Sequence, residues 1–198
     1  LEDRILAEED GLRSPISEGS VWVIDPIDGT NNFVTQKEDF AVMVAYFEDG
    51  IGQFGLIYDV MRDHLFYGGG EFPVYRNEVE LTPFVDQPLE NFLIASNVGM
   101  LEKNDWGMAD LGMDSLGIRV YGSAGISFSK ILSGGILAYF SYIWPWDYAA
   151  AAIMGEQLGY TVLNLNGDKP NYQSVEPIMM VPKVKLTEIQ TYLKKGRS

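Results

Sequence analysis

The chain has 198 residues, of which 46% are hydrophobic, and its 28 Asp and Glu against 14 Lys and Arg give a formal net charge of −14 at pH 7. This is the composition of an ordinary globular protein that can bury a core, and so acidic a surface repels phosphate backbones, which argues against a nucleic-acid partner. With no cysteine and one histidine, the chain has no disulfide or thiolate site and lacks the ligands of a His-based zinc site. We therefore expect a cytoplasmic protein whose chemistry uses carboxylates, hydroxyls and backbone groups.

The first part of the chain predicts an antiparallel sheet. A short apolar strand at residues 21–24 is followed by two β-rich runs, residues 40–59, joined at Asp49-Gly50, which is a strong hairpin signal. Residues 64–70 add a strand that ends in glycines. The chain opens without a signal-peptide pattern, in what looks like the middle of an element, so we expect further residues to precede it.

After residue 83 the pattern changes to alternating strands and helices, which predicts α/β layering. We place the boundary near residues 82–87 and predict two units, residues 1–84 and 85–198. No apolar run reaches the ~18 to 20 residues of a membrane span, so we predict no membrane partner. The predicted strands of the second unit are residues 91–97, 117–122, 161–164 and 176–181, and its predicted helices are residues 100–111, 123–132, 148–159 and 185–195.

The stretch VIDPIDGTNNF, residues 23–33, places two aspartates directly after an apolar strand. Two residues separate Asp25 from Asp28, and one of them, Pro26, fixes the backbone between the aspartates. This spacing lets two carboxylates and the Ile27 carbonyl converge on one point. Because all three are oxygen ligands, they suit a hard cation such as Mg²⁺.

The two residues after Asp28 favour an anion. Gly29 lets backbone approach a phosphate closely, and Thr30 offers a hydroxyl and an N–H beside it. If a helical turn begins here, its free N–H groups also favour phosphate. The alternative is an Asx-turn with purely local reasons for Asp and Gly, but a chance match to five fixed positions of DPIDGT occurs about once in ten million sites.

Four segments together resemble the inositol monophosphatase family, part of the lithium-sensitive, Mg²⁺-dependent phosphatase superfamily. DPIDGTNNF resembles the first signature of that family, and ILAEED (residues 5–10) resembles its upstream Gly-Glu-Glu element, with Ala7 in place of the glycine. YGSAGISFSK (residues 121–130) resembles the Gly-Ser-Ala segment, and WPWDYAAAA (residues 144–152) the Trp-Asp signature that opens a helix. The resemblance covers nearly the whole chain.

This resemblance implies a layered α/β sandwich of αβαβα type, like fructose-1,6-bisphosphatase, with an antiparallel sheet first and a mixed sheet with helices second. It implies a homodimer, lithium sensitivity, and two or three Mg²⁺ ions as cofactors. The family also has helices upstream of the Glu-Glu element, carrying an aspartate that pairs with the Thr30-type residue, and the sequence from Leu1 contains no match to them.

The resemblance also implies a role for each matching residue. The implied metal ligands are Glu8, Asp25, the Ile27 carbonyl, Asp28 and Asp147. The implied catalytic residues are Thr30, Asp28 and Glu8, of which Thr30 helps to activate the attacking water. The implied substrate contacts are Asp25, Asp28, Gly29, Thr30, Gly122, Ala124 and Asp147.

Two of these residues also have simpler interpretations. Glu8 by itself is one of several clustered surface acids. Asp147 by itself is a helix N-cap ahead of Tyr148, a role that leaves one oxygen for a metal.

Inositol phosphatases also carry a glutamate that binds an inositol hydroxyl seven residues before the metal aspartate. This chain has Phe140 there, which predicts against myo-inositol phosphate as the substrate.

The sequence therefore predicts a Mg²⁺-dependent phosphomonoesterase acting on a small phosphorylated polyol, sugar or nucleotide, such as inositol 1-phosphate, by attack of metal-activated water. A different class of function is also open: a non-catalytic, regulatory protein that binds metal or phosphate with the same fold. Within the enzyme class, phosphatases of 3′-phosphoadenosine 5′-phosphate and of fructose 1,6-bisphosphate are alternatives, although TNNF favours the inositol phosphatase branch.

Overall fold

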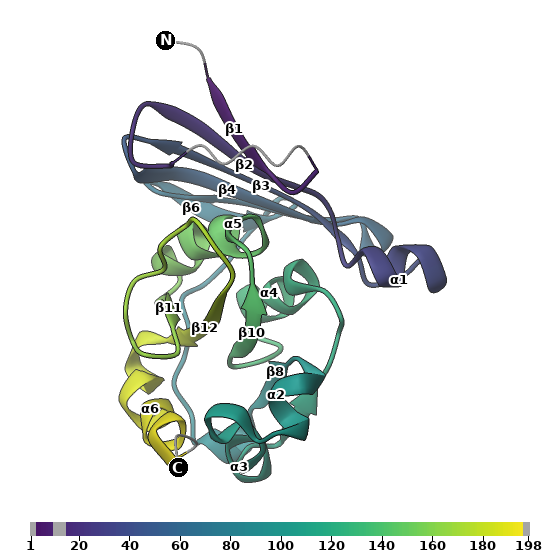
Figure 1. Cartoon of the computed structure of the whole chain (residues 1–198), viewed down its shortest axis with the longest axis vertical. Helices are drawn as coiled ribbons and strands as arrows, with labels where there is room; N and C mark the ends of the chain where they lie inside the picture. Colours follow the sequence, from purple (N-terminus) through teal and green to yellow (C-terminus); the bar gives the residue numbers. More distant parts are fainter. Residues whose placement is uncertain (1–2, 10–14, 196–198) are drawn as a thin grey trace.

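Two β-sheets organise the part of the chain that the computed structural model describes, residues 3–9 and 15–195 (Figure 1). The strands of the first sheet follow one another in chain order, and all neighbours are antiparallel except β1, which runs parallel to β2. The predicted antiparallel sheet is thus confirmed with one parallel edge pair. Its strands are β1 (Arg4–Ala7), β2 (Ser20–Asp28), β3 (Ala41–Glu48), β4 (Ile51–Asp59), β5 (His64–Gly69), β6 (Phe72–Arg76) and β7 (Val79–Glu80).

The predicted hairpin between β3 and β4 turns at Asp49 and Gly50. Both residues have positive φ, 47° and 80°, which is the geometry of a type I′ turn and matches the right-handed twist of the strands. The structure therefore confirms this turn and explains why Gly follows Asp there.

The second sheet is mixed, as predicted, with the strand order β11-β12-β10-β8-β9. β8, β9 and β10 are parallel to their neighbours within this group, and β12 runs antiparallel to both β10 and β11. The central strand β10 is absent from the predicted strands. The bounds are β8 (Leu93–Ser96), β9 (Gly117–Arg119), β10 (Tyr139–Ile143), β11 (Tyr160–Asn164) and β12 (Glu176–Pro182).

The helices form layers with the two sheets (Figure 1). α4 (Ala124–Leu132) and α5 (Pro145–Gln157) lie between the sheets, whereas α2 (Val98–Glu102), α3 (Met108–Asp114) and α6 (Leu186–Lys195) cover the far face of the second sheet. The predicted layered sandwich is confirmed. Among the described residues, no helix covers the outer face of the first sheet. The short elements are α1 (Thr30–Thr35) and the 3₁₀ turns η1 (Val60–Arg62), η2 (Leu89–Asn91), η3 (Asp105–Gly107) and η4 (Lys183–Lys185).

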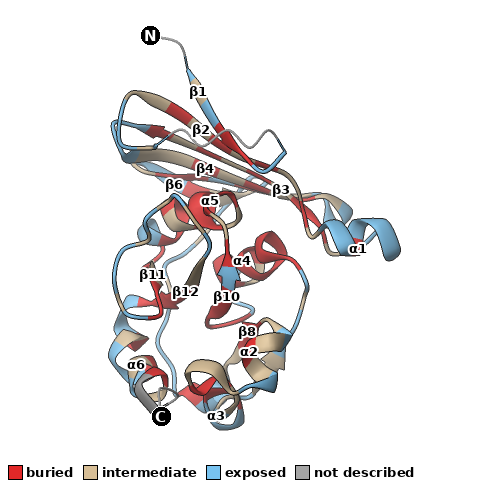
Figure 2. Cartoon of the chain, in the orientation of Figure 1, coloured by how far each residue is buried: buried red, intermediate tan, exposed pale blue. Residues whose placement is uncertain are grey.

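Two buried clusters fill the spaces between these layers (Figure 2). The larger one joins the inner face of the first sheet to α4 and α5. Here α5 can approach β4 closely because small residues meet: a Cβ on Gly55 would lie 2.4 Å from the carbonyl oxygen of Ala150. Glycine at position 55 is therefore a packing requirement of the contact between β4 and α5.

Four predicted elements differ from the structure by three residues or more. The strand predicted at residues 117–122 ends at Arg119. The helix predicted at residues 100–111 is broken by η3, where Asn104, Trp106 and Gly107 have positive φ. The second helix of the middle layer begins at Pro145, three residues before its predicted start. The strand predicted at residues 21–24 continues to Asp28, so the aspartates belong to the strand itself.

The predicted division at residues 84/85 falls between β7 and η2. The larger buried cluster contains residues from both sides of it, and the division into two units stays a prediction. In the described ranges, no helix combines the length and the apolar character needed to cross a membrane.

Candidate active site

Three carboxylates converge where the first sheet meets the helices of the middle layer. Asp25 and Asp28 come from β2, and Asp147 comes from the first turn of α5. One oxygen of each lies within 4.8 Å of the others. Asp25 and Asp28 are buried, with 1% and 7% of their surface exposed, so the charges face one another largely out of water.

A β-bulge puts the two aspartates of β2 on the same face of the sheet. Asp25 pairs with Met43 and Asp28 with Ala41, so three steps along β2 match two steps along β3. In a regular strand, residues three apart point to opposite faces. The extra residue of the bulge, next to Pro26, cancels this alternation and turns both carboxylates inward.

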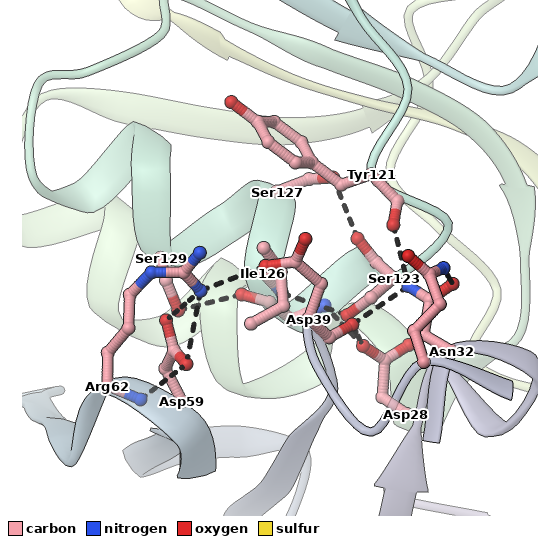
Figure 3. A network of polar contacts seen from close by, with 12 residues as sticks. Asp28, Asn32, Asp39, Asp59, Arg62, Tyr121, Ser123, Ile126, Ser127 and Ser129 are labelled. Atoms are coloured by element: carbon pink, nitrogen blue, oxygen red, sulfur yellow. Dashed lines mark hydrogen bonds and ion pairs between the residues drawn. The ribbon is translucent and has the colours of Figure 1, made fainter. Parts of the chain in front are cut away.

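The N-terminus of α4 holds Asp28 in place (Figure 3). The carboxylate accepts hydrogen bonds from the Ser123 hydroxyl, from the N–H of Ala124 at 3.1 Å and from the N–H of Gly125 at 2.8 Å. The Ser123 oxygen also caps the helix by accepting the N–H of Ile126 at 3.1 Å. A carboxylate 95 residues from Ser123 in the sequence is therefore aligned by a helix end, where negative charge is favoured.

Asp147 is positioned by its own helix. One oxygen accepts the backbone N–H of Trp144 at 2.8 Å. Trp144 is the N-cap of α5 and Asp147 is the third helical residue, so the interpretation of Asp147 as an N-cap ahead of Tyr148 is wrong. The error follows from the late start predicted for the helix. The second oxygen of Asp147 is left for the acidic cluster.

The pKa values of the cluster are raised, as expected for like charges in a buried site. Burial, and next the charge of Asp28, raise the pKa of Asp25 to about 7. Burial raises the pKa of Asp28 against the opposing effect of its three donors. Burial and the charge of Asp28 also raise the pKa of Asp147 well above its ordinary value. The site thus has an excess of negative charge that a cation would neutralise.

Glu8 lies at the edge of this cluster. Ala7 pairs with Ile24 in the parallel register of β1 and β2, so Glu8 follows Ala7 at the level of Asp25. Its side chain is exposed, and its pKa is raised by partial burial and by the charges of Glu9 and Asp28. Glu8 is outside the group of three oxygens within 4.8 Å, and its role as a metal ligand stays a prediction.

The turn after Asp25 is closed by local hydrogen bonds. The N–H of Ile27 donates to the Asp25 carboxylate at 3.0 Å, and the Thr30 hydroxyl donates to the Ile27 carbonyl at 3.1 Å. Gly29 has φ 84° and precedes α1. A Cβ there would lie 2.9 Å from the Cβ of Ser123. The turn therefore requires glycine both for its backbone conformation and for its close approach to α4.

A cavity of about 290 Å³ opens beside the carboxylates. Asp28 and Asp147 line one end of it, and the predicted substrate contacts Gly122 and Ala124 lie in its wall. Several polar residues of this wall were not predicted from the sequence, among them Ser96, Asn97, Ser123 and Ser141. Ser96 and Asn97 were detectable as polar residues at the end of a buried strand, the usual place of ligand contacts in α/β sheets. Ser141 could be identified only from β10, because the strand determines which of its side chains face the cavity.

The side chain that β10 directs to the cavity is Ser141, not Phe140. Phe140 is fully buried in the smaller core cluster, opposite Met179 of β12. Tyr139 and Ser141 line the cavity instead, because alternate residues of a strand point to opposite faces. The argument from Phe140 against myo-inositol phosphate is therefore wrong: counting seven residues back from Asp147 does not identify the residue that faces the site.

Gly125 is expected to be intolerant of alanine. Glycine to alanine within a helix normally stabilises it, but a Cβ on Gly125 would lie 2.8 Å from the Cβ of Ala41 and 3.1 Å from Oδ2 of Asp28. We expect Gly125→Ala to lower the free energy of unfolding by about 1–3 kcal/mol and to reduce activity, as measured by chemical denaturation and phosphate release. Gly99→Ala is the matched control, because Gly99 is the second residue of α2 as Gly125 is of α4, and its nearest contact would be an ordinary 3.6 Å. Equal stability of the two variants would contradict this account.

Sequence comparison places these residues in a family. The model of the inositol monophosphatase family matches residues 2–196. The chain belongs to this family. It is 38% identical over 171 residues to the inositol-1-monophosphatase of Bacillus subtilis, covering 83% of the chain and 64% of that protein. It is 28% identical over 177 residues to human inositol monophosphatase 2, covering 83% of the chain and 61% of that protein. The chain thus spans less than two thirds of the length of these relatives.

Solved structures give the same result for the fold. Inositol monophosphatase-II from Staphylococcus aureus superposes with a TM-score of 0.92 at 31% identity, over 100% of this chain and 78% of that one. SaIMPase-II with inositol monophosphate bound has a TM-score of 0.90 at 31% identity, over 98% and 77%. The resemblance predicted from the four sequence segments, and with it the sandwich fold, is confirmed.

Proposed function

We propose that this chain carries the active site of a Mg²⁺-dependent phosphomonoesterase that hydrolyses a small phosphorylated polyol, sugar or nucleotide. The observation that supports this most directly is the convergence of Asp25, Asp28 and Asp147 beside a cavity that Asp28 and Asp147 line. Phosphate esters are anionic, so a site made of carboxylates can bind them only with cations in between.

The residues present fit Mg²⁺. The site offers only oxygen ligands, and Mg²⁺ prefers such hard ligands. Burial raises the pKa values of all three carboxylates, and the charge of Asp28 raises those of Asp25 and Asp147 further. We infer that Asp25, Asp28 and Asp147 hold the ions, two or three in number, with Glu8 and the Ile27 carbonyl as further ligands. A related IMPase/NADP phosphatase, 25% identical with a TM-score of 0.87, has been solved with Mg²⁺ and phosphate.

Bound Mg²⁺ would lower the pKa of an attacking water and stabilise the negative charge of the leaving oxygen. The chain's own groups orient the reactants. We infer that the Thr30 hydroxyl, fixed by its bond to the Ile27 carbonyl at 3.1 Å, accepts a hydrogen bond from the water that attacks phosphorus. The N–H groups of Gly29 and Thr30 would bind phosphate oxygens. As the new P–O bond forms, the ester P–O bond breaks. The attacking water gives up a proton to solvent, and the leaving alkoxide takes up a proton and departs as the alcohol.

The cavity suits a hydroxylated leaving group. Ser96, Asn97 and Ser141 supply hydrogen-bonding groups, and Asn97 is fixed by donating to the Ser141 oxygen at 3.2 Å and capping α2. Val98, Val120 and Ile143 add apolar surface, a mixture typical of small-molecule sites. SaIMPase-II has been solved with inositol monophosphate and with 2′AMP, two esters of hydroxyl-rich rings. We therefore propose a substrate of this kind.

The test is phosphate release by the whole protein with Mg²⁺ and four esters: inositol 1-phosphate, 2′AMP, fructose 1,6-bisphosphate and 3′-phosphoadenosine 5′-phosphate. We expect Mg²⁺-dependent release from at least one, abolished by EDTA and restored by Mg²⁺. Binding of Mg²⁺ without release from any ester would overturn the enzymatic proposal and favour the non-catalytic alternative. The homodimer, the cytoplasmic location and the lithium sensitivity implied by the resemblance stay predictions.

A further inference from the structure

Asn32 is a buried polar residue just behind the proposed phosphate-binding turn, with 8% of its surface exposed. Its amide nitrogen donates to two backbone carbonyls, that of Asp39 at 2.9 Å and that of Tyr121 at 2.7 Å. Tyr121 is 89 residues away in the sequence. Both amide hydrogens are therefore used. They connect the segment after Gly29 to the segment before α4, two segments that are also joined by the bonds of Asp28 to Ser123, Ala124 and Gly125.

Each bonded segment borders a different part of the site (Figure 3). Asn32 belongs to α1, which begins directly after Gly29. Tyr121 precedes Gly122 and Ser123, which line the cavity. Asn32 packs tightly against the segment at residues 121–122, since a Cβ on Gly122 would lie 3.1 Å from Oδ1 of Asn32. The side chain of Asn32 thus spans from the phosphate side of the site to its alcohol side.

The other carbonyl that Asn32 binds belongs to Asp39, whose side chain takes part in ion pairs. Asp39 has φ 49° and precedes β3, and its carboxylate binds the Arg62 guanidinium at 2.9 Å. Arg62 also binds the buried carboxylate of Asp59 at 3.1 Å (Figure 3). These ion pairs connect Asp39 to Asp59 at the end of β4 and to Arg62 of η1, so the carbonyl that Asn32 binds belongs to a segment linked to the first sheet.

We propose that Asn32 is a positioning residue that holds the Gly29–Thr30 turn at the correct distance from residues 121–124, so that one ligand can contact both. This inference rests on the proposed function, because it concerns the phosphate and the alcohol of one ester. A loss of alignment of about 1 Å between two parts of a site is enough to cost about a hundredfold in rate.

The two hydrogen bonds from Asn32 to the carbonyls of Asp39 and Tyr121 require a side-chain amide. Alanine would leave two carbonyls without their donor. Aspartate has the same shape, but it would place a negative oxygen opposite two carbonyl oxygens and remove both donors. Serine keeps one donor, so it should retain part of the alignment.

The experiment compares Asn32→Ala, Asn32→Ser and Asn32→Asp in the whole protein. Calorimetric titration at saturating Mg²⁺ measures the Kd for inorganic phosphate, and a separate titration measures the Kd for Mg²⁺. We expect Asn32→Ala to weaken phosphate binding about tenfold and to lower kcat about ten- to a hundredfold, with the Kd for Mg²⁺ within about twofold of wild type. Amide hydrogen exchange in α1 should accelerate. Asn32→Ser should be intermediate and Asn32→Asp no better than Asn32→Ala.

Asn91→Ala is the matched control, because Asn91 is an exposed asparagine in η2, in the second part of the chain. It should leave all four quantities unchanged. Unchanged phosphate affinity and α1 exchange in Asn32→Ala would overturn the inference. So would unfolding of both the alanine and serine variants, or a parallel loss of Mg²⁺ affinity, since Asn32 would then support the fold as a whole.

The proposed function fails in a different way. Wild-type protein that binds phosphate but releases none from any ester contradicts hydrolysis, and the phosphate titration and amide exchange still decide the role of Asn32. Wild-type protein that binds no phosphate at all contradicts both proposals.

Discussion

The Asp147→Asn variant is expected to lose at least about a hundredfold in kcat/KM while its fold is preserved or stabilised. The substitution removes one charge from the proposed Mg²⁺ site. The side-chain oxygen of asparagine can still accept the N–H of Trp144, the bond that Asp147 makes at 2.8 Å, so the first turn of α5 keeps its support. In the metal-free protein, removing one of three clustered like charges relieves repulsion, and the midpoint of thermal unfolding should rise.

The opposite changes in activity and in unfolding temperature make this prediction specific. An ordinary destabilising mutation lowers activity and unfolding temperature together, whereas this variant should lower only activity. Phosphate release and calorimetric unfolding in EDTA measure the two effects. Asp168→Asn is the control, because Asp168 is exposed in the loop after β11 and undergoes the same chemical change. Activity of Asp147→Asn within about threefold of wild type would rule out Asp147 as a ligand.

The second large effect is a loss of metal-free stability with rising pH. The pKa of Asp25 is raised from 3.8 to about 7, and burial also raises the pKa values of Asp28 and Asp147. Between pH 4 and 7 the folded state therefore holds more protons than the unfolded state, so these groups make the free energy of unfolding fall as pH rises. For Asp25 the decrease is about 2–4 kcal/mol, since one pKa unit corresponds to about 1.4 kcal/mol.

Mg²⁺ should reverse this loss. Because Mg²⁺ displaces protons from the carboxylates, its apparent affinity should rise by up to about tenfold per pH unit for each displaced proton between pH 5 and 7. The increase in the free energy of unfolding caused by Mg²⁺ should therefore also grow with pH. Urea unfolding at pH 5, 6, 7 and 8, with and without Mg²⁺, measures both effects. Asp147→Asn should show a smaller dependence on pH. If wild-type stability without metal is constant from pH 5 to 8, the carboxylates are not coupled as the structure indicates.

Part of the site follows from local sequence. The order Asp-Pro-Ile-Asp-Gly-Thr contains its own geometry: Pro26 restricts the backbone, Gly29 supplies a positive φ of 84°, and the short spacing brings Ile27 and Thr30 within hydrogen-bonding distance. Such features depend on neighbours along the chain, so they can be predicted from the sequence. The Asp49-Gly50 hairpin is of the same kind.

Other parts depend on register and on contacts between distant segments. The bulge that turns Asp25 and Asp28 to one face appears only in the pairing of β2 with β3. Phe140 was expected at the site but lies in the core, and Ser141 lines the cavity instead. Without β10 as a predicted strand, the faces on which these two side chains lie could not be assigned.

By itself, the sequence determined the acidic motif, because this motif rests on residue types at short spacings. It determined the family and the layered fold through the resemblance of four short segments to a known family. Only the tertiary structure decided which side chains form the site together. Asp147 meets Asp25 and Asp28, the N-terminus of α4 binds Asp28, and Asn32 bonds to Tyr121. The physical reason is that these contacts arise from packing α4 and α5 against the first sheet. Such packing joins residues about 90 to 120 positions apart, and no local propensity or pattern reports which of them will meet.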